Sequence, residues 1–526
     1  MTLIKSLLLG SAAGIVAVAT AQAADLPTRK AAPVEYVRVC NVGGITGWTL
    51  PGSDTCVKFS GYLTAQFTGG NLNTQYNWAN TSILAGLTGI PPLPFAQGLS
   101  TQRVLVAASQ AQGNTTFYRH ETGWSTRANL SFDMASNTAY GPLIGHIDIN
   151  SEAANGFDAL GGTTYLNTGY LTWAGITAGM AQSFFSFTAG GDNWANFLSP
   201  DRKGFNEPTL LAYTASFGGG FTATISAESP GPVGGSGGGV QSTGAIGSNP
   251  GNITFGGQRW PDIVGALHFK QGWGEAQLSG VLHNVNVSSN AVTSGLVAAD
   301  SCGVAAIALV NCATQHNQIG WGIDAGVKFN LTGWGGMFGA GDDILFTGAY
   351  TQNATWYSGL PDMMWGENGQ VNGNGQPMYL ADAFFNPLTN QWSSPRAWSV
   401  TALLEHHWTP TFYTDLEASY GGINWSNMGG GCNILGFGCG IASAINGPLS
   451  PSARTWLVGA DLGWNPVTNL NFDLELMYQA VSQTKPSGFL GTVYNLGGVG
   501  GAVFVPGDWH GNSDGFAGRL RITRYF

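Results

Sequence analysis

The chain has 526 residues, of which 9% are charged, 12% are aromatic and 80 are glycine, and its net charge is −10. A typical soluble domain carries ~25% charged residues, so this composition argues against an ordinary soluble surface. The acidic balance argues against nucleic-acid binding, which needs basic stripes. Polar residues are mostly uncharged and alternate with apolar ones, as in strands that are hydrated on one face.

The N-terminal region has the layout of an export signal. Lys5 precedes an apolar run at 7–19, and the small residues at 21–23 form a cleavage site. This pattern predicts that residues 1–23 are a secretory signal peptide. No later stretch approaches the ~18 apolar residues that a spanning helix needs. We expect residues 24–54 to form a periplasmic N-terminal segment.

The six cysteines fall in three close pairs, Cys40/Cys56, Cys302/Cys312 and Cys432/Cys439. Zinc sites favour C-x₂₋₄-C spacing with further ligands nearby, and none of the pairs has it. In an exported chain we therefore predict three local disulfides, and the sequence leaves their connectivity open. The first would tie the N-terminal segment to the opening strand, and the other two would staple glycine-rich loops.

Alternation with a period of two recurs along the chain and predicts strands with one apolar and one polar face. In the first strand, Val57 and Phe59 alternate with Lys58. The candidates in chain order are 57–67, 127–134, 146–150, 162–174, 175–187, 208–217, 220–229, 262–271, 275–287, 318–330, 342–352, 397–407, 411–425, 455–464, 469–479 and 514–526. About sixteen strands is an even number, which brings both ends of a barrel to one side.

The strand at 469–479 shows why the polar face must be wet. Asp473 and Glu475 share one face, and Leu474 and Leu476 lie on the other. Burying these carboxylates in a dry sandwich core would cost several kcal/mol each. A transmembrane antiparallel β-barrel resolves this, because its outer face meets lipid and its inner face meets a watery lumen. The predicted fold is therefore an all-β transmembrane barrel over residues 55–526.

The connections between these strands alternate in length. Short turns include 137–141, 408–411 and 464–468, whereas the long loops lie near 69–121, 188–207, 230–261, 288–317, 353–396, 426–451 and 481–513. Short turns face the periplasm and long loops face outside in such barrels. Two further segments, Arg103–Ser109 or Met378–Phe385, could extend the barrel to eighteen strands.

Two sequences match chemical motifs without the context that the chemistry needs. The run Gly234–Gly238 fits G-x-S-x-G, but a nucleophile elbow requires a strand-to-helix turn, and this run lies in a glycine-rich loop. His406 and His407 are neighbours on a strand and so point to opposite faces. A metal site would need further convergent ligands. We expect no catalytic residue, no metal site and no cofactor.

Charged residues predict a constriction in the lumen. The long loop between the fifth and sixth predicted strands, near 188–207, is the third loop on its side of the barrel and carries three acids, Asp192, Asp201 and Glu207. Four bases should point inward from the first, second and last strands, namely Lys58, Arg127, Arg519 and Arg521. Closure makes these strands neighbours, so a loop folding inward would face a basic patch. Each charge acts within a Debye length of ~8 Å, which tunes ion preference instead of blocking passage.

The start of the predicted mature chain resembles that of the alphaproteobacterial outer-membrane porins. The resemblance lies in residues 24–40 and in 51–62, which leads into the first strand. It implies a homotrimer of sixteen-stranded barrels, each a passive channel constricted by its third loop. This chain departs from the family in its enlarged loops and in Arg524, where assembly signals often carry an aromatic. Phe526 is intact and would engage the outer-membrane assembly machinery.

We therefore predict an outer-membrane porin that forms a passive, water-filled channel for small hydrophilic solutes and ions. Small outward residues near the closure point, Gly61, Ala128 and Gly518, would let neighbouring walls pack closely in lipid. The alternative is an adhesin or a substrate-specific channel that uses the enlarged loops. The net negative charge favours a mild preference for cations, which the basic patch could reverse.

Overall fold

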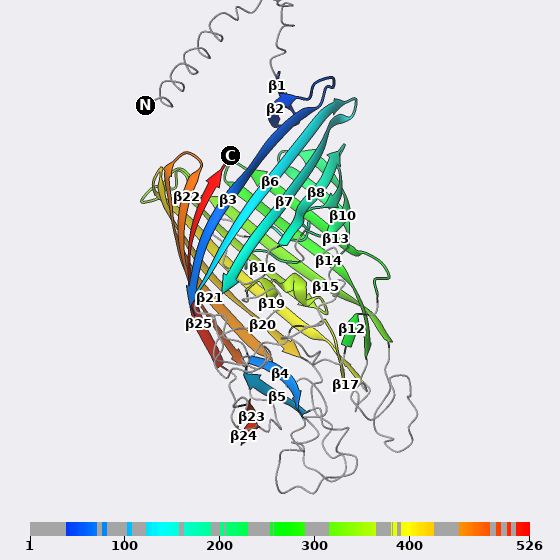
Figure 1. Cartoon of the computed structure of the whole chain (residues 1–526). Helices are drawn as coiled ribbons and strands as arrows, with labels where there is room; N and C mark the ends of the chain where they lie inside the picture. The colour runs from blue at the N-terminus through cyan, green and yellow to red at the C-terminus, as the bar shows by residue number, and fades with distance from the viewer. Residues whose placement is uncertain are drawn as a thin grey trace, which may run out of the picture.

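The structure of the protein is a computed structural model (Figure 1). It describes residues 38–70, 76–81, 102–107, 122–156, 163–190, 200–204, 207–229, 253–255, 257–289, 315–363, 380, 382–386, 391–425, 452–483, 491–495, 502–506 and 512–526. The predicted signal peptide lies outside these residues. Within the described ranges, no helix has the length and apolar character that crossing a membrane would require.

Sixteen antiparallel strands form a closed ring, which confirms the predicted barrel. In ring order they are β3 (Cys56–Gly70), β6 (Thr122–Thr138), β7 (Gly141–Gly156), β8 (Thr163–Trp173), β9 (Ile176–Met180), β10 (Thr209–Gly218), β11 (Phe221–Ser229), β13 (Asp262–Gln271), β14 (Gly274–Ser289), β15 (Gln315–Asn330), β16 (Asp343–Gln352), β19 (Pro395–Thr409), β20 (Phe412–Trp425), β21 (Ala453–Val467), β22 (Leu470–Gln483) and β25 (Asn512–Tyr525). The ring closes where β25 pairs with β3, from Ala517↔Gly70 to Tyr525↔Tyr62. Closure removes the open edge that lipid could not satisfy.

The eighteen-strand alternative is wrong, because both candidate segments pair outside the ring. Arg103–Ser109 overlaps β5 (Gln102–Ala107), and Met378–Phe385 reaches β17 (Phe384–Asn386), which pairs with β18 (Gln391–Ser393). β5 belongs to a separate four-stranded sheet with β4 (Tyr76–Thr81), β23 (Gly491–Asn495) and β24 (Ala502–Pro506). This sheet lies at the long-loop end of the barrel, and the C-terminus lies at the opposite end, with the short turns (Figure 1).

The N-terminal segment is tied to the opening strand. β1 (Val39–Val42) and β2 (Ile45–Thr49) form a hairpin, and β2 pairs with the start of β3. Cys40 forms the predicted disulfide with Cys56. β12 (Ile253–Phe255) extends the main sheet by pairing with the end of β14.

The other two predicted disulfides are not among the features that the structure describes. Cys302 and Cys312 belong to the connection between β14 and β15, and Cys432 and Cys439 belong to the connection between β20 and β21. All four of these cysteines lie outside the described residues. The pairs Cys302/Cys312 and Cys432/Cys439 therefore stay predictions from the sequence, whereas the pair Cys40/Cys56 is confirmed.

The two faces of the wall differ as the alternation predicts. Large apolar side chains such as Phe59, Leu63 and Leu476 are exposed on the outer face. The inward register partners are mostly polar, as in the pair Thr64↔Arg127 between β3 and β6. The outer face is therefore suited to lipid and the inner face to water.

The predicted strand 175–187 is too long. β9 ends at Met180, and the chain then leaves the wall and enters the barrel. Phe185 is fully buried in a cluster with Val264 and Val281. Burying this phenylalanine inside the barrel contributes more to stability than continued strand pairing would. The inserted segment therefore begins at residue 181. We call residues 181–208 the third loop.

Candidate channel and its constriction

The third loop is fixed to the inner wall soon after it leaves β9. Ser183 Oγ donates to Glu228 Oε2 on β11 at 2.6 Å, and the backbone N–H of Phe184 donates to the other carboxylate oxygen at 3.1 Å. Ser279 Oγ on β14 donates to the carbonyl of Phe185 at 2.5 Å. The loop therefore runs along the wall and narrows the lumen.

Further along, the third loop reaches β19, which lies well around the ring from β10. Lys203 is fully buried there, and its Nζ donates to Ser399 Oγ at 2.9 Å and to Thr401 Oγ1 at 3.3 Å. Thr401 Oγ1 in turn donates to the carbonyl of Pro200 at 3.0 Å. A buried ammonium held by hydroxyls and a carbonyl makes this a fixed attachment.

A second loop also folds inside the barrel, which the sequence analysis did not predict. We call residues 353–394, between β16 and β19, the sixth loop. It forms two short 3₁₀ turns, η3 (Thr355–Ser358) and η4 (Pro361–Met363). The yellow-green helical turn of η3 lies within the outline of the barrel in Figure 1. A cluster of apolar residues unusual for a hydrated loop, Trp356, Tyr357, Leu360 and Met363, is the sequence signal that could have revealed it.

The sixth loop spans the lumen between distant parts of the wall and packs on the third loop. The Tyr357 ring lies 4.9 Å from that of Phe185, centroid to centroid. Ser399 Oγ on β19 donates to the carbonyl of Ser358 at 2.5 Å. Gln479 Nε2 on β22 donates to the carbonyl of Met363, also at 2.5 Å. The two loops thus form one partition, which we call the inner partition.

A buried polar network holds the sixth loop to β13 and β14. His283 Nδ1 lies 2.6 Å from Asp262 Oδ2, and its Nε2 lies 3.4 Å from Asp382 on the loop. Tyr357 OH donates to the same oxygen of Asp262 at 2.6 Å. Burial and the Asp262 carboxylate raise the pKa of Tyr357 well above its usual value, so the phenol stays a donor. His283 and both aspartates are completely buried.

Three of the four predicted bases lie near one another on the inner wall. Arg519 and Arg521 lie on β25 and Arg127 lies on β6, and both of these strands pair with β3. Arg521 donates to Gln66 Oε1 through Nε at 3.1 Å and through Nη2 at 3.0 Å. Arg127 forms an ion pair with Glu152 at 2.7 Å. The structure thus brings these three guanidinium groups to one side of the lumen.

The remaining predicted residues lie elsewhere. Lys58 pairs in register with Asp133, eight residues from Gln66, or roughly 26 Å along β3 at ~3.3 Å per residue. Asp201 is 1% exposed and accepts a hydrogen bond from Thr188 Oγ1 at 2.8 Å. Glu207 is half-buried just before β10. Asp192 lies outside the described residues.

The two histidines both contact Asp342, since the backbone N–H of His407 donates to Asp342 Oδ1 at 2.7 Å, and the side chain of His407 has a further partner. His406 Nδ1 lies 2.6 Å from Asp342 Oδ2, and His407 Nε2 lies 3.3 Å from Glu405. In the part of the chain that the structure describes, no group of three His, Cys, Asp or Glu side chains is arranged to hold a metal ion. The G-x-S-x-G run lies outside that part.

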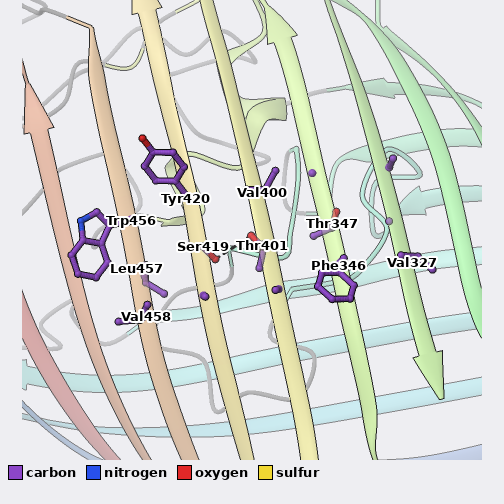
Figure 2. A pocket seen from close by; sticks show the side chains of 15 residues that line it. Val327, Phe346, Thr347, Val400, Thr401, Ser419, Tyr420, Trp456, Leu457 and Val458 are labelled. Carbon is purple, nitrogen blue, oxygen red and sulfur yellow. Dashed lines mark hydrogen bonds between the residues drawn. The ribbon is translucent and has the colours of Figure 1, made fainter. Parts of the chain in front are cut away.

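A groove of about 720 Å³ lies on the outer wall across β15, β16, β19, β20 and β21. Figure 2 shows the bulky side chains along it, including Phe346, Tyr420 and Trp456. Its floor has small residues such as Gly348 and Ala418. Phe346, Tyr420 and Trp456 are all exposed on the apolar outer face. The groove therefore belongs to the lipid-facing surface and is separate from the lumen.

A closed sixteen-stranded barrel with an apolar outer band and a polar lumen defines an outer-membrane channel protein. The family model described as "Porin subfamily" matches residues 25–496. The chain belongs to the porin subfamily, as the resemblance of its N-terminal region indicates.

Curated relatives and solved structures are similar to this chain. Porin Omp2a of Brucella ovis is 29% identical over 276 residues, which cover 52% of this chain and 68% of that protein. Porin Omp2b of Brucella suis biovar 1 is 29% identical over 278 residues, covering 52% and 63%. The outer-membrane channel DcaP of Acinetobacter baumannii is 12% identical with a TM-score of 0.49, covering 91% of this chain and 99% of that one. The match to curated relatives thus spans about two thirds of their length.

Proposed function

We propose that the protein forms a passive, water-filled channel for small hydrophilic solutes and ions. The observation that carries this is the closed ring of sixteen strands with a polar inner face. Eight strands would leave an interior filled by side chains, whereas barrels of 16–18 strands leave an aqueous channel. Membership of the porin subfamily supports a channel over an enzyme.

The constriction in this proposal is the space between the inner partition and the wall that carries the arginines. Arg127, Arg519 and Arg521 supply the positive side. Asp192 and Glu207 of the third loop supply the negative side. Asp201, buried in the loop, and Lys58, near the opposite end of β3, act on passing ions only through their fields. The resulting transverse field orients small dipolar solutes and sets ion preference.

The proposed assembly is a homotrimer in contact through the outer face near the closure of the barrel. Gly61, Ala128 and Gly518 lie there on β3, β6 and β25. Small residues let neighbouring walls approach closely in lipid. Unheated gel electrophoresis should give a band near three times the monomer mass. A mass measurement that finds monomer alone in mild detergent would contradict the trimer.

Planar-bilayer recording tests the channel. Purified, folded protein should insert with stepwise, ohmic conductance in KCl, and heat-unfolded protein from the same preparation should not. If the current carried by one solute saturates at a low concentration of that solute, the channel is substrate-specific instead. Folded protein without any conductance would overturn the proposal and favour the adhesin.

A further inference from the structure

Two arginines carry the charge on the outer face of the five strands that form the groove. The outward positions of β15, β16, β19, β20 and β21 contain no Asp, Glu or Lys, and the arginines among them are Arg396 and Arg454. Each is the second residue of its strand, on β19 and β21, at the end where the long loops begin. Long loops face outside in such barrels, so both charges lie at the level of the outer leaflet.

The two arginines adjoin the same asparagine, Asn424. Arg396 pairs in register with Asn424 on β20, so their side chains are neighbours on one face. Arg454 reaches this asparagine from β21, and its Nη2 donates to Asn424 Oδ1 at 3.1 Å. A Cβ at Gly422 would collide with the Arg454 side chain, so this glycine lets the guanidinium lie across β20. The sheet therefore concentrates two positive charges in one region of the outer face.

Arg454 is held in place by its surroundings. Its Cζ lies 5.7 Å from the centroid of the Trp398 ring, and its Nη1 donates to the carbonyl of Ala453 at 2.9 Å. These contacts orient the guanidinium without neutralising its charge. Among the residues that the structure describes, neither Arg396 nor Arg454 forms an ion pair with a carboxylate. The positive charge in this region therefore has no paired counter-charge in the described wall.

The groove begins directly beside these arginines. Arg454 is two residues from Trp456 on β21, and Trp398 is two residues from Val400 on β19. Trp456 and Val400 line the groove (Figure 2). Two residues along a strand span ~7 Å, so the charges lie at the rim of the groove. Its volume of about 720 Å³ lies in the ~300–1,000 Å³ range of small-molecule sites.

We propose that this groove and its rim bind one phosphorylated lipid of the outer leaflet. The lipid phosphate contacts Arg396 and Arg454, and one acyl chain fills the groove. A guanidinium fork matches phosphate in a bidentate geometry that a point charge cannot offer. Bulk lipid is as apolar as the groove, so packing holds the chain while the arginines determine which lipid binds.

Charge complementarity favours a lipid over a second copy of the chain as the occupant. A twofold contact would place this face against itself, with arginines opposite arginines. The outward positions of the five strands offer no acid to pair with them. The proposed trimer contact involves β3, β6 and β25, and β22 separates β21 from β25 in the ring. The groove is therefore left to lipid in the proposed trimer.

The site is separate from the lumen, so this inference does not rest on the proposed channel. On the inward face of the same stretch, Ala397, Ile423 and Ala453 are buried in the cluster that includes the sixth loop. A lipid on the outer face stabilises these strand ends from the other side of the wall. Lipid should therefore raise the unfolding temperature and leave the conductance unchanged.

Native mass spectrometry of the delipidated, full-length protein in detergent tests the site. Dimyristoyl phosphatidate and dimyristoyl phosphatidylcholine are the probes, since they share their acyl chains and differ in whether the phosphate is capped by choline. One phosphatidate per chain should bind about tenfold or more tightly than phosphatidylcholine. The double variant Arg396→Gln, Arg454→Gln should weaken phosphatidate binding by about 10- to 100-fold and leave phosphatidylcholine binding unchanged.

Two other variants separate the rim from the groove. Arg524→Gln is the matched control, because Arg524 is also exposed on the outer face but lies at the short-turn end, where it donates to the carbonyls of Asn469 and Tyr525. It should bind both lipids as the wild type does. Ala418→Leu fills the floor of the groove and should weaken both lipids equally. Heat-modifiable gel mobility checks that each variant is folded, and the single variant Arg454→Gln is the substitute if the double variant fails.

Three results would overturn the site. Equal phosphatidate binding by the wild type and the double variant would show that the arginines do not hold the phosphate. Displacement of the lipid by an equal concentration of inorganic phosphate would make free phosphate the occupant. Loss of oligomers in lipid-free Ala418→Leu would make the groove a contact between copies of the chain. Absent conductance in bilayers with an intact preference for phosphatidate would contradict the channel proposal alone.

Discussion

Tyr357 offers a direct test of how the sixth loop is held inside the barrel. The substitution Tyr357→Phe removes the hydroxyl that donates to Asp262 at 2.6 Å. It leaves the ring in place against Phe185. Asp262 keeps its contact with His283 and accepts the N–H of Asn284 at 2.9 Å. The change therefore removes one hydrogen bond and little packing.

The magnitude follows from the charge on the acceptor. A hydrogen bond to a charged group contributes ~1.5–3 kcal/mol, and each ~1.4 kcal/mol is a factor of ten in an equilibrium constant. The population in which the sixth loop has left the wall should therefore rise by about 10- to 100-fold. A displaced partition changes the width of the lumen, so single-channel currents should fluctuate more.

Hydrogen exchange and single-channel recording measure this effect together. Amides of residues 353–363 should exchange faster in Tyr357→Phe, and the open-channel noise should increase. Tyr478→Phe is the matched control, because its hydroxyl also donates to an aspartate, Asp514, at 3.0 Å but at an exposed site. If both variants leave exchange and noise unchanged, the hydroxyl does not hold the loop and the reasoning is refuted.

Three other changes test the third loop, the disulfide and the basic patch. A Cβ at Gly326 would overlap the Phe187 ring, so Gly326→Ala should cost ~1–3 kcal/mol, displace the third loop and raise conductance. Reducing the Cys40–Cys56 disulfide should lower the free energy of unfolding by ~3 kcal/mol on a chain-entropy basis, which lowers the unfolding temperature, and should leave conductance unchanged. Arg521→Gln should shift the reversal potential toward cations in a KCl gradient.

Each of these changes has an outcome that contradicts it. Gly265→Ala is the control for Gly326→Ala, since its added Cβ meets no atom within 4 Å, and equal conductance in the two variants would place Phe187 away from the pore. If the unfolding temperature does not change with reductant, the disulfide does not stabilise the opening strand. An unchanged reversal potential in Arg521→Gln would exclude that guanidinium from the ion path.

The wall of the barrel could be predicted from sequence because its signal is local. Lipid on one face and water on the other force a period of two in each strand, and this pattern can be read without knowing the neighbours. The inward direction of Arg519 and Arg521 follows from the same alternation. Pairing of Cys40 with Cys56 needed little more, since the two cysteines are close in the chain.

The inner partition could not be predicted because its contacts are distant in sequence. The residues that hold the sixth loop come from β13, β14, β19 and β22, and no local pattern joins them. The early end of β9 has the same origin, since Phe185 packs against Tyr357, far along the chain. Alternation indicates which face a residue takes, but it does not indicate which loop covers that face.

The residue types on the inward face of the wall nevertheless indicate where the loops lie. Ala397, Ile423 and Ala453 are in-register partners on β19, β20 and β21, and all three are fully buried in the cluster with Leu360 and Met363 of the sixth loop. Apolar residues on a face that is otherwise polar therefore mark the stretch that the partition covers. On the same strands, about eight residues away and toward the short turns, three carboxylates are in-register partners instead, namely Glu405, Asp415 and Asp461. Each of these strands thus carries an apolar segment that holds a loop and, nearer the short turns, a segment that carries a carboxylate.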